Sequence, residues 1–158
     1  VCNPMLDRIT LILASELSRQ GYRTMPVAAS LYVPGKYFAG TVSQKIAPHL
    51  AGLGRIGKNG LVVTPKDGPR VRWGTVLTDF PVETGKALER NCGNCSLCVQ
   101  ACPPKALKGK SFDPNAPREA YIDVGICHDY RNSIAEGYGS RTCGKCIAVC
   151  PFANRKNN

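Results

Sequence analysis

Eight of the nine cysteines lie between residues 92 and 150, and their spacing constrains this chain more than any other feature. The first four have the spacing C-x-x-C-x-x-C-x-x-x-C followed by proline, at Cys92, Cys95, Cys98 and Cys102. In bacterial iron–sulfur proteins three thiolates of such a run hold one [4Fe–4S] cluster, and the fourth serves a second cluster. Zinc sites are usually built from separated C-x-x-C pairs. The spacing therefore predicts [4Fe–4S] clusters.

The remaining cysteines supply the matching half of a two-cluster arrangement. Cys143, Cys146 and Cys150 repeat the end of the motif without its first member, and Cys127, sixteen positions before Cys143, can supply it. If the fourth cysteine of each run serves the other run's cluster, the ligands divide into two sets. Cluster one has Cys92, Cys95, Cys98 and Cys150, and cluster two has Cys102, Cys127, Cys143 and Cys146. Two such clusters accept and pass on single electrons.

Composition argues against several other classes of protein. Disulfide frameworks belong mainly to short chains with a signal peptide, and these 158 residues show no such peptide. No apolar run approaches the ~20 residues of a membrane helix, so we expect a cytoplasmic protein that does not bind a membrane. The net charge of +10 would suit nucleic acid, but thiolate-bound clusters would offset part of it. The ninth cysteine, Cys2, is interpreted as a small buried apolar side chain.

The stretch AGLGRIGKNGLVVT at residues 51–64 has the glycine spacing of a nucleotide-binding loop, but its context is reversed. A dinucleotide loop follows a strand and opens a helix. Here apolar residues at helical spacing precede the glycines, and a short β-branched run follows them. Asn59 also stands where a phosphate loop needs Ser or Thr. We expect these glycines to let backbone pass close to another segment. The candidate loop residues are Gly52, Gly54, Gly57 and Lys58.

The first 90 residues are predicted to form a small α/β domain. Residues 3–21 have the capping residues of a helix and an apolar stripe formed by Leu6, Ile9, Leu13 and Leu17. Residues 22–30 are predicted to be extended, 41–53 helical, and 60–82 a hairpin around turn residues 65–69. From residue 91 regular periodicity fades. We therefore assign residues 1–90 to the α/β domain and 91–158 to a two-cluster ferredoxin-type domain, which gives an α+β fold class.

Taken together, three segments resemble the corrinoid-dependent epoxyqueuosine reductases and reductive dehalogenases. They are residues 51–83, the run CGNCSLCVQACPPKAL, and the closing GICHDYRNSIAEGYGSRTCGKCIAVCPF. The resemblance implies a partial nitroreductase-like domain, which in that family holds a cobalamin, and two clusters that feed electrons to its cobalt. It also implies that residues 52–60 approach the corrinoid or the clusters, and that Lys58 contacts a cofactor phosphate or propionamide.

The chain also departs from that family. Epoxyqueuosine reductases have an acidic proton donor shortly before the glycine loop, whereas this chain has no Asp or Glu from residue 17 to 66. Tyr32 and Tyr37 are the other candidate donors. Since catalysis needs a placed proton donor, we favour an electron-transfer protein that works with a redox partner or a reductase subunit. The alternative is a complete small cobalamin-dependent reductase that reduces a C–halogen or C–O bond, so its status as an enzyme stays open.

Overall fold

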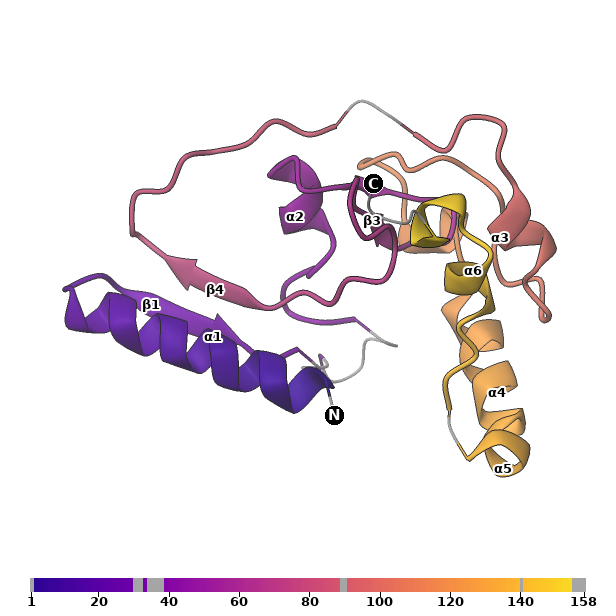
Figure 1. Ribbon diagram of the computed structural model, residues 1–158, viewed down its shortest axis with the longest axis horizontal. Coiled ribbons are helices and arrows are strands. Elements are labelled where there is room, and N and C mark those ends of the chain that lie inside the picture. The colour runs from indigo at the N-terminus through magenta and orange to yellow at the C-terminus, as the bar shows by residue number, and fades with distance from the viewer. Residues whose placement is uncertain (1, 30–32, 34–38, 89–90, 140, 155–158) are drawn as a thin grey trace.

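The computed structural model describes residues 2–29, 33, 39–88, 91–139 and 141–154, and combines helices with short strands (Figure 1). The N-terminal elements lie on one side of the molecule, and the cysteine-bearing helices, in orange and yellow, lie on the other. The glycine-rich stretch and strand β3 lie next to the cysteine-bearing helices. The expected mixture of helix and strand is confirmed.

A long helix and a two-stranded ribbon form the N-terminal part. Helix α1 (Cys2–Arg19) is followed by Gly21, whose φ of 94° is typical of a helix exit. Strand β1 (Thr24–Val27) pairs antiparallel with β4 (Thr75–Thr78), in the register Thr24↔Thr78. The predicted first helix is thus confirmed, and the segment after it is extended. Neither α1 nor any other helix in the described part has the length and apolarity needed to span a membrane.

The face of α1 that packs on the ribbon differs from the predicted stripe. Thr10 and Ala14 are buried, whereas Ile9 and Leu13 are 57% and 49% exposed. The hydroxyl of Thr24 donates to the carbonyl of Ala14 at 3.0 Å, so strand and helix backbones approach closely. Close approach favours small side chains, and the contact face is therefore rotated away from the larger aliphatic residues.

The second helix, α2 (Ile46–Leu50), is shorter than the helix predicted over residues 41–53. Pro48 explains its late start, because a proline nitrogen cannot donate to the carbonyl of Gln44 and the regular bonding pattern cannot extend further back. Gly52, with a φ of 75°, lies just beyond its end. The sequence prediction that a helix precedes the glycines is confirmed.

The hairpin predicted over residues 60–82 is wrong. Strand β3 (Val62–Val63) pairs with β2 (Arg55–Ile56), and β4 pairs with β1 instead. The turn between the expected strands does form, since the backbones of Thr64 and Gly68 exchange hydrogen bonds of 2.9 and 3.1 Å. The short loop 57–61 closes the β2–β3 pair locally, which leaves β4 to pair with the distant β1.

Short helices carry the cysteines. Helices α3 (Leu97–Gln100) and α6 (Lys145–Ala148) pack against each other, whereas α4 (Val124–Ser133) and α5 (Ala135–Tyr138) extend away from α3 (Figure 1). The 3-10 helices η1 (Arg118–Ala120) and η2 (Pro151–Asn154) complete this part. Its buried apolar residues, within the described ranges, are Ala106, Leu107 and Tyr121. So small an apolar core needs further cross-links to hold these helices together.

Gly52→Ala is expected to destabilise the fold more than the matched control Gly139→Ala. Both glycines have positive φ, 75° and 63°, and alanine in that region costs ~1–2 kcal/mol. A Cβ at residue 52 would also overlap the Lys86 carbonyl, whereas one at residue 139 would meet no atom within 4 Å. Anaerobic thermal unfolding measures the difference. Equal losses of stability would contradict a close approach between residues 52 and 86.

Candidate metal centre

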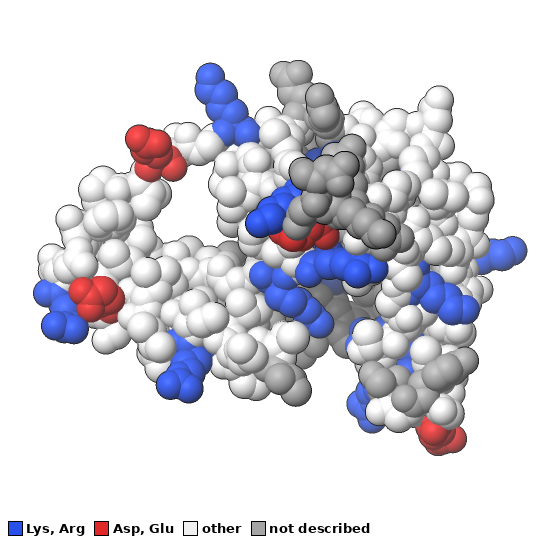
Figure 2. Space-filling model, in the orientation of Figure 1, with Lys and Arg blue, Asp and Glu red and all other residues white. Residues whose placement is uncertain are grey.

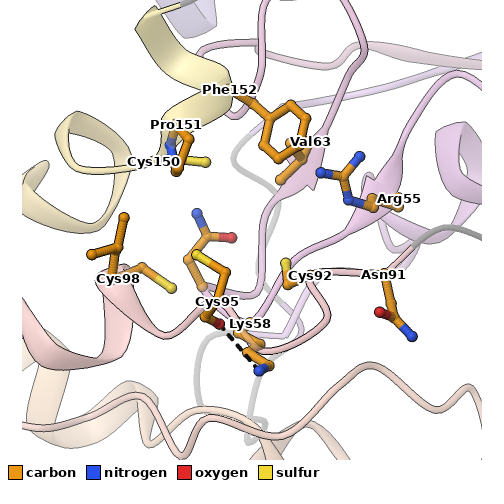
Figure 3. A pocket seen from close by; sticks show the side chains of 12 residues that line it. Arg55, Lys58, Val63, Asn91, Cys92, Cys95, Cys98, Cys150, Pro151 and Phe152 are labelled. Carbon is orange, nitrogen blue, oxygen red and sulfur yellow. Dashed lines mark hydrogen bonds between the residues drawn. The ribbon is translucent and has the colours of Figure 1, made fainter.

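Four cysteines from opposite ends of the cysteine-rich part line one cavity (Figure 3). Cys92 and Cys95 come from the loop before α3, Cys98 from α3, and Cys150 from the residue before η2. Figure 3 shows their sulfur atoms around a common space. The chain thus brings Cys150 beside three cysteines that lie more than fifty positions earlier in the sequence.

The loop before α3 is folded tightly, which brings its first two thiols to the same cavity. The backbone N–H of Cys95 donates to the carbonyl of Cys92 at 3.0 Å. The N–H of Gly93 donates to Oδ1 of Asn91 at 2.7 Å, and Gly93 has a φ of 51°. Glycine suits this position because the turn needs a left-handed backbone. A single helical turn then carries Cys98.

Cys150 lies at the break between two short helices. Its N–H donates to the carbonyl of Ile147 at 3.1 Å, and its own carbonyl accepts from the N–H of Ala153 at 2.8 Å. Pro151 follows directly and has no N–H with which to continue α6. The thiol is therefore held at the point where the chain changes direction toward the cavity.

We refer to the other four cysteines, Cys102, Cys127, Cys143 and Cys146, as the second group; Cys127 lies on α4 and Cys146 on α6. The pKa of the Cys146 thiol is raised to about 11, mainly by burial and to a lesser extent by the charges of Cys127, Cys143, Cys98 and Cys102. Burial also raises the pKa of Cys127, with smaller contributions from Cys102 and Cys143 and an opposing one from Arg131.

The thiols of the first group influence one another in the same way. Burial raises the pKa of Cys98 most, and the charges of Cys92, Cys95 and Cys150 follow. A raised pKa keeps a thiol protonated at neutral pH when no metal is bound. Metal binding at such thiols must therefore displace protons.

Helix α4 carries Cys127 to the second group because both its start and the preceding segment are anchored. Oδ1 of Asp123 accepts the N–H of Ile126 at 3.0 Å, which caps the helix. The N–H of Asp123 donates to the carbonyl of Ala106 at 2.9 Å, and Leu107 pairs with Ile122 in an isolated bridge. The residues after α3 thus fix where α4 begins.

Cys92, Cys95, Cys98 and Cys150, the set predicted for cluster one, line one cavity. The second ligand set, Cys102, Cys127, Cys143 and Cys146, stays a prediction. All nine cysteines are described, and none of them forms a disulfide. The expectation that Cys2 is buried is wrong: it is exposed, at the first turn of α1. Within the described ranges, no three His, Cys, Asp or Glu side chains are arranged to hold a single metal ion.

Strands β2 and β3 and the loop between them, residues 55–63, form a glycine-rich hairpin. This hairpin packs against the first group of cysteines, which are Cys92, Cys95, Cys98 and Cys150. Nζ of Lys58 donates to the carbonyls of Gly93 and Cys95, at 2.7 and 3.1 Å. A Cβ added to Gly57 would lie 3.6 Å from Sγ of Cys92 and 3.0 Å from Cγ2 of Val63. The hairpin therefore approaches the thiols so closely that this position has little room for a side chain.

The other two candidate glycines lie in different contacts. A Cβ on Gly54 would lie 2.7 Å from Cγ1 of Val62, within the β2–β3 pair. Gly52 lies against the backbone of Lys86. Of the four candidate loop residues, Lys58 lines the cavity and Gly57 lies beside Cys92, while contact between any of them and a corrinoid stays a prediction.

Two functional candidates were missed in the sequence. Arg55 and Asn59 both line the cavity and are 6% and 5% exposed. Nδ2 of Asn59 donates to the carbonyl of Cys146 at 3.5 Å, and its Oδ1 accepts the N–H of Leu61 at 3.1 Å. Asn59 therefore joins the hairpin to the helix of the second group. Their position beside the glycines was the available signal, but only the fold shows that they are buried.

Residues 91–153 match the family model of the 4Fe-4S double cluster binding domain. The chain therefore contains an iron–sulfur domain of the two-cluster class, as the cysteine spacing predicted.

The chain is also homologous to two groups of reductases. It is 34% identical over 116 residues to an epoxyqueuosine reductase from Staphylococcus aureus, which covers 71% of this chain and 30% of that protein. It is 32% identical over 111 residues to a tetrachloroethene reductive dehalogenase from Sulfurospirillum multivorans, which covers 65% and 22%. The resemblance to both groups is confirmed, and the chain spans less than a third of the length of these relatives.

Solved structures of both kinds share this fold. The epoxyqueuosine reductase of Bacillus subtilis has a TM-score of 0.69 at 22% identity, covering 99% of this chain and 40% of that one. A reductive dehalogenase whose structure suggests a mechanism for B12-dependent dehalogenation has a TM-score of 0.70 at 22% identity, covering 93% and 20%. At such low identity these comparisons establish the fold alone.

Lys58→Met is expected to loosen the loop that carries Cys92 and Cys95, because it removes two hydrogen bonds to that loop's carbonyls. Reconstituted protein should then release iron to a chelator several-fold faster than the unmodified chain. The matched control Lys66→Met alters an exposed lysine in the 64–68 turn and should leave the rate unchanged. Equal rates for both variants would contradict the anchoring function of Lys58.

Proposed function

We propose that this chain is an electron-transfer iron–sulfur protein in which the two groups of cysteines ligate two [4Fe–4S] clusters. Cluster one is held by Cys92, Cys95, Cys98 and Cys150, and cluster two by Cys102, Cys127, Cys143 and Cys146. The observation that carries the proposal is the convergence of the first four thiols on one cavity. Free thiols around a buried arginine nitrogen without a partner are a donor set that fits an anionic cluster.

The crossed ligand sets would make the two clusters neighbours. Cys98 and Cys102 lie one helical turn apart at α3 and serve different clusters, as do Cys146 and Cys150 at α6. Bound clusters supply one-electron redox chemistry. The chain's own residues orient the thiols, restrict access of water through the hairpin at residues 55–63, and keep the two sites adjacent.

We also propose a domain division, a compartment and a partner for this chain. Residues 1–90 form a partial nitroreductase-like domain, and 91–158 form the two-cluster domain, with the hairpin of the first resting on the second.

Nine unpaired thiols suit a reducing compartment such as the cytoplasm. Lys and Arg outnumber Asp and Glu on the face shown in Figure 2. Together with the net charge of +10, this supports an acidic redox partner protein.

A complete cobalamin-dependent reductase is the second candidate, supported by the homology to reductases of both kinds. Cobalamin is accordingly the implied further cofactor. Residues 17–66 contain no carboxylate that could serve as the proton donor such a reductase needs. The other candidate donors, Tyr32 and Tyr37, lie outside the described residues. We therefore favour electron transfer as the function of this chain.

Anaerobically prepared protein should contain about eight iron and eight sulfide per chain, and Cys150→Ser should lose about half of the iron. The double variant Cys95/Cys150→Ser should lose little more, because both residues serve one cluster. Cys127/Cys150→Ser should lose nearly all of it. Cys2→Ser is the control and should retain full iron content. If the Cys127/Cys150 variant kept as much iron as Cys150→Ser alone, the crossed ligation would be wrong.

Titration with cobalamin separates the two candidate functions. An electron-transfer protein without a corrinoid site should leave the visible spectrum of added cobalamin unchanged and retain no cobalt after gel filtration. Stoichiometric cobalt retention would instead favour the reductase. The iron content of the same sample shows that the clusters are intact during the test.

A further inference from the structure

Arg55 is the one charged side chain that is buried among the described residues, and it lies in the wall of the cluster-one cavity. It is 6% exposed and opens strand β2, where it is paired with Val63. Figure 3 shows its guanidinium reaching from the strand toward the cavity and the Phe152 ring. The fold therefore places a permanent positive charge in the wall of the cavity that four cysteine thiols also line.

The charge on Arg55 is poorly compensated by the protein. Its Nε–H is buried and has no hydrogen-bond partner, and none of the ion pairs between described residues includes it. The guanidinium carbon lies 4.1 Å from the centre of the Phe152 ring. A cation–π contact stabilises a buried guanidinium by less than the burial of an uncompensated cation costs.

An anionic group in the cavity would resolve this imbalance. Four thiolates around an oxidised [4Fe–4S] core leave the cluster with a net negative charge, and its sulfur atoms accept hydrogen bonds. The inference rests on the proposed function, because it requires a cluster held by Cys92, Cys95, Cys98 and Cys150. Within the described residues, no other arginine lines this cavity.

We propose that Arg55 donates its Nε–H to a sulfur of cluster one and raises the reduction potential of that cluster. An electron taken up by the cluster adds one negative charge and breaks no bond. A buried cation stabilises the reduced form more than the oxidised form, since the attraction grows with the cluster's charge. Hydrogen bonds to cluster sulfur act in the same direction. Arg55 is therefore a residue that tunes cluster one while leaving its ligands unchanged.

Arg55→Met tests the proposal, because methionine preserves part of the apolar stem and removes both charge and donor. At a fixed applied potential, one of the two clusters should show at least a tenfold lower ratio of reduced to oxidised form, a shift of about 59 mV for one electron. The other cluster should titrate as before. Arg55→Lys keeps the charge, so the potential of that cluster should lie between its values in the unmodified chain and in Arg55→Met. Arg72→Met, an exposed arginine, is the control for a general charge effect.

A second measurement uses the unmodified chain and needs no folded variant. Protein grown with ¹⁵N in its arginine side chains is reduced and studied by pulsed electron paramagnetic resonance. A ¹⁵N coupling to one cluster is expected, and its absence would overturn the proposed hydrogen bond. Unchanged potentials in a fully loaded Arg55→Met protein would overturn the tuning. Protein that never binds iron would instead contradict the proposed function itself.

Discussion

The convergence of thiols from residues 92–98 and from residue 150 on one cavity is the constraint on which the cysteine-rich part depends. This part buries few apolar side chains, and its helices are mostly a single turn long. Helices of that length are not stable alone. Bonds from two iron–sulfur clusters to eight cysteines would link α3, α4 and α6 in the way that a larger apolar core links the helices of other domains.

The glycine-rich hairpin couples the N-terminal part to both groups of cysteines. Lys58 binds the loop of Cys92 and Cys95, and Asn59 reaches the carbonyl of Cys146. Arg55 adds a buried charge to the same wall. The spacing of a nucleotide-binding loop is thus used here to bring backbone and polar side chains against thiols. Glycine is needed for close approach, as in a nucleotide loop, but the group approached is different.

The sequence predictions were correct where the interactions act within a few residues and wrong where they join distant segments. The first helix was predicted well because caps and helical spacing act within a few residues. The hairpin over residues 60–82 was wrong because β4 pairs with β1, about fifty positions away, and nothing local indicates that choice. The packed face of α1 was also mispredicted, since the close approach of Thr24 favours Ala14 over larger neighbours.

The sequence by itself determined the class of cofactor, because ligand spacing along the chain reflects the geometry of the cluster. It also argued against a nucleotide loop, since the order of helix and strand is a local property. Only the tertiary structure decided that Arg55 and Asn59 are buried beside the thiols. Burial arises from contacts between segments that are far apart in sequence, and a charged residue next to three glycines carries no local sign of it.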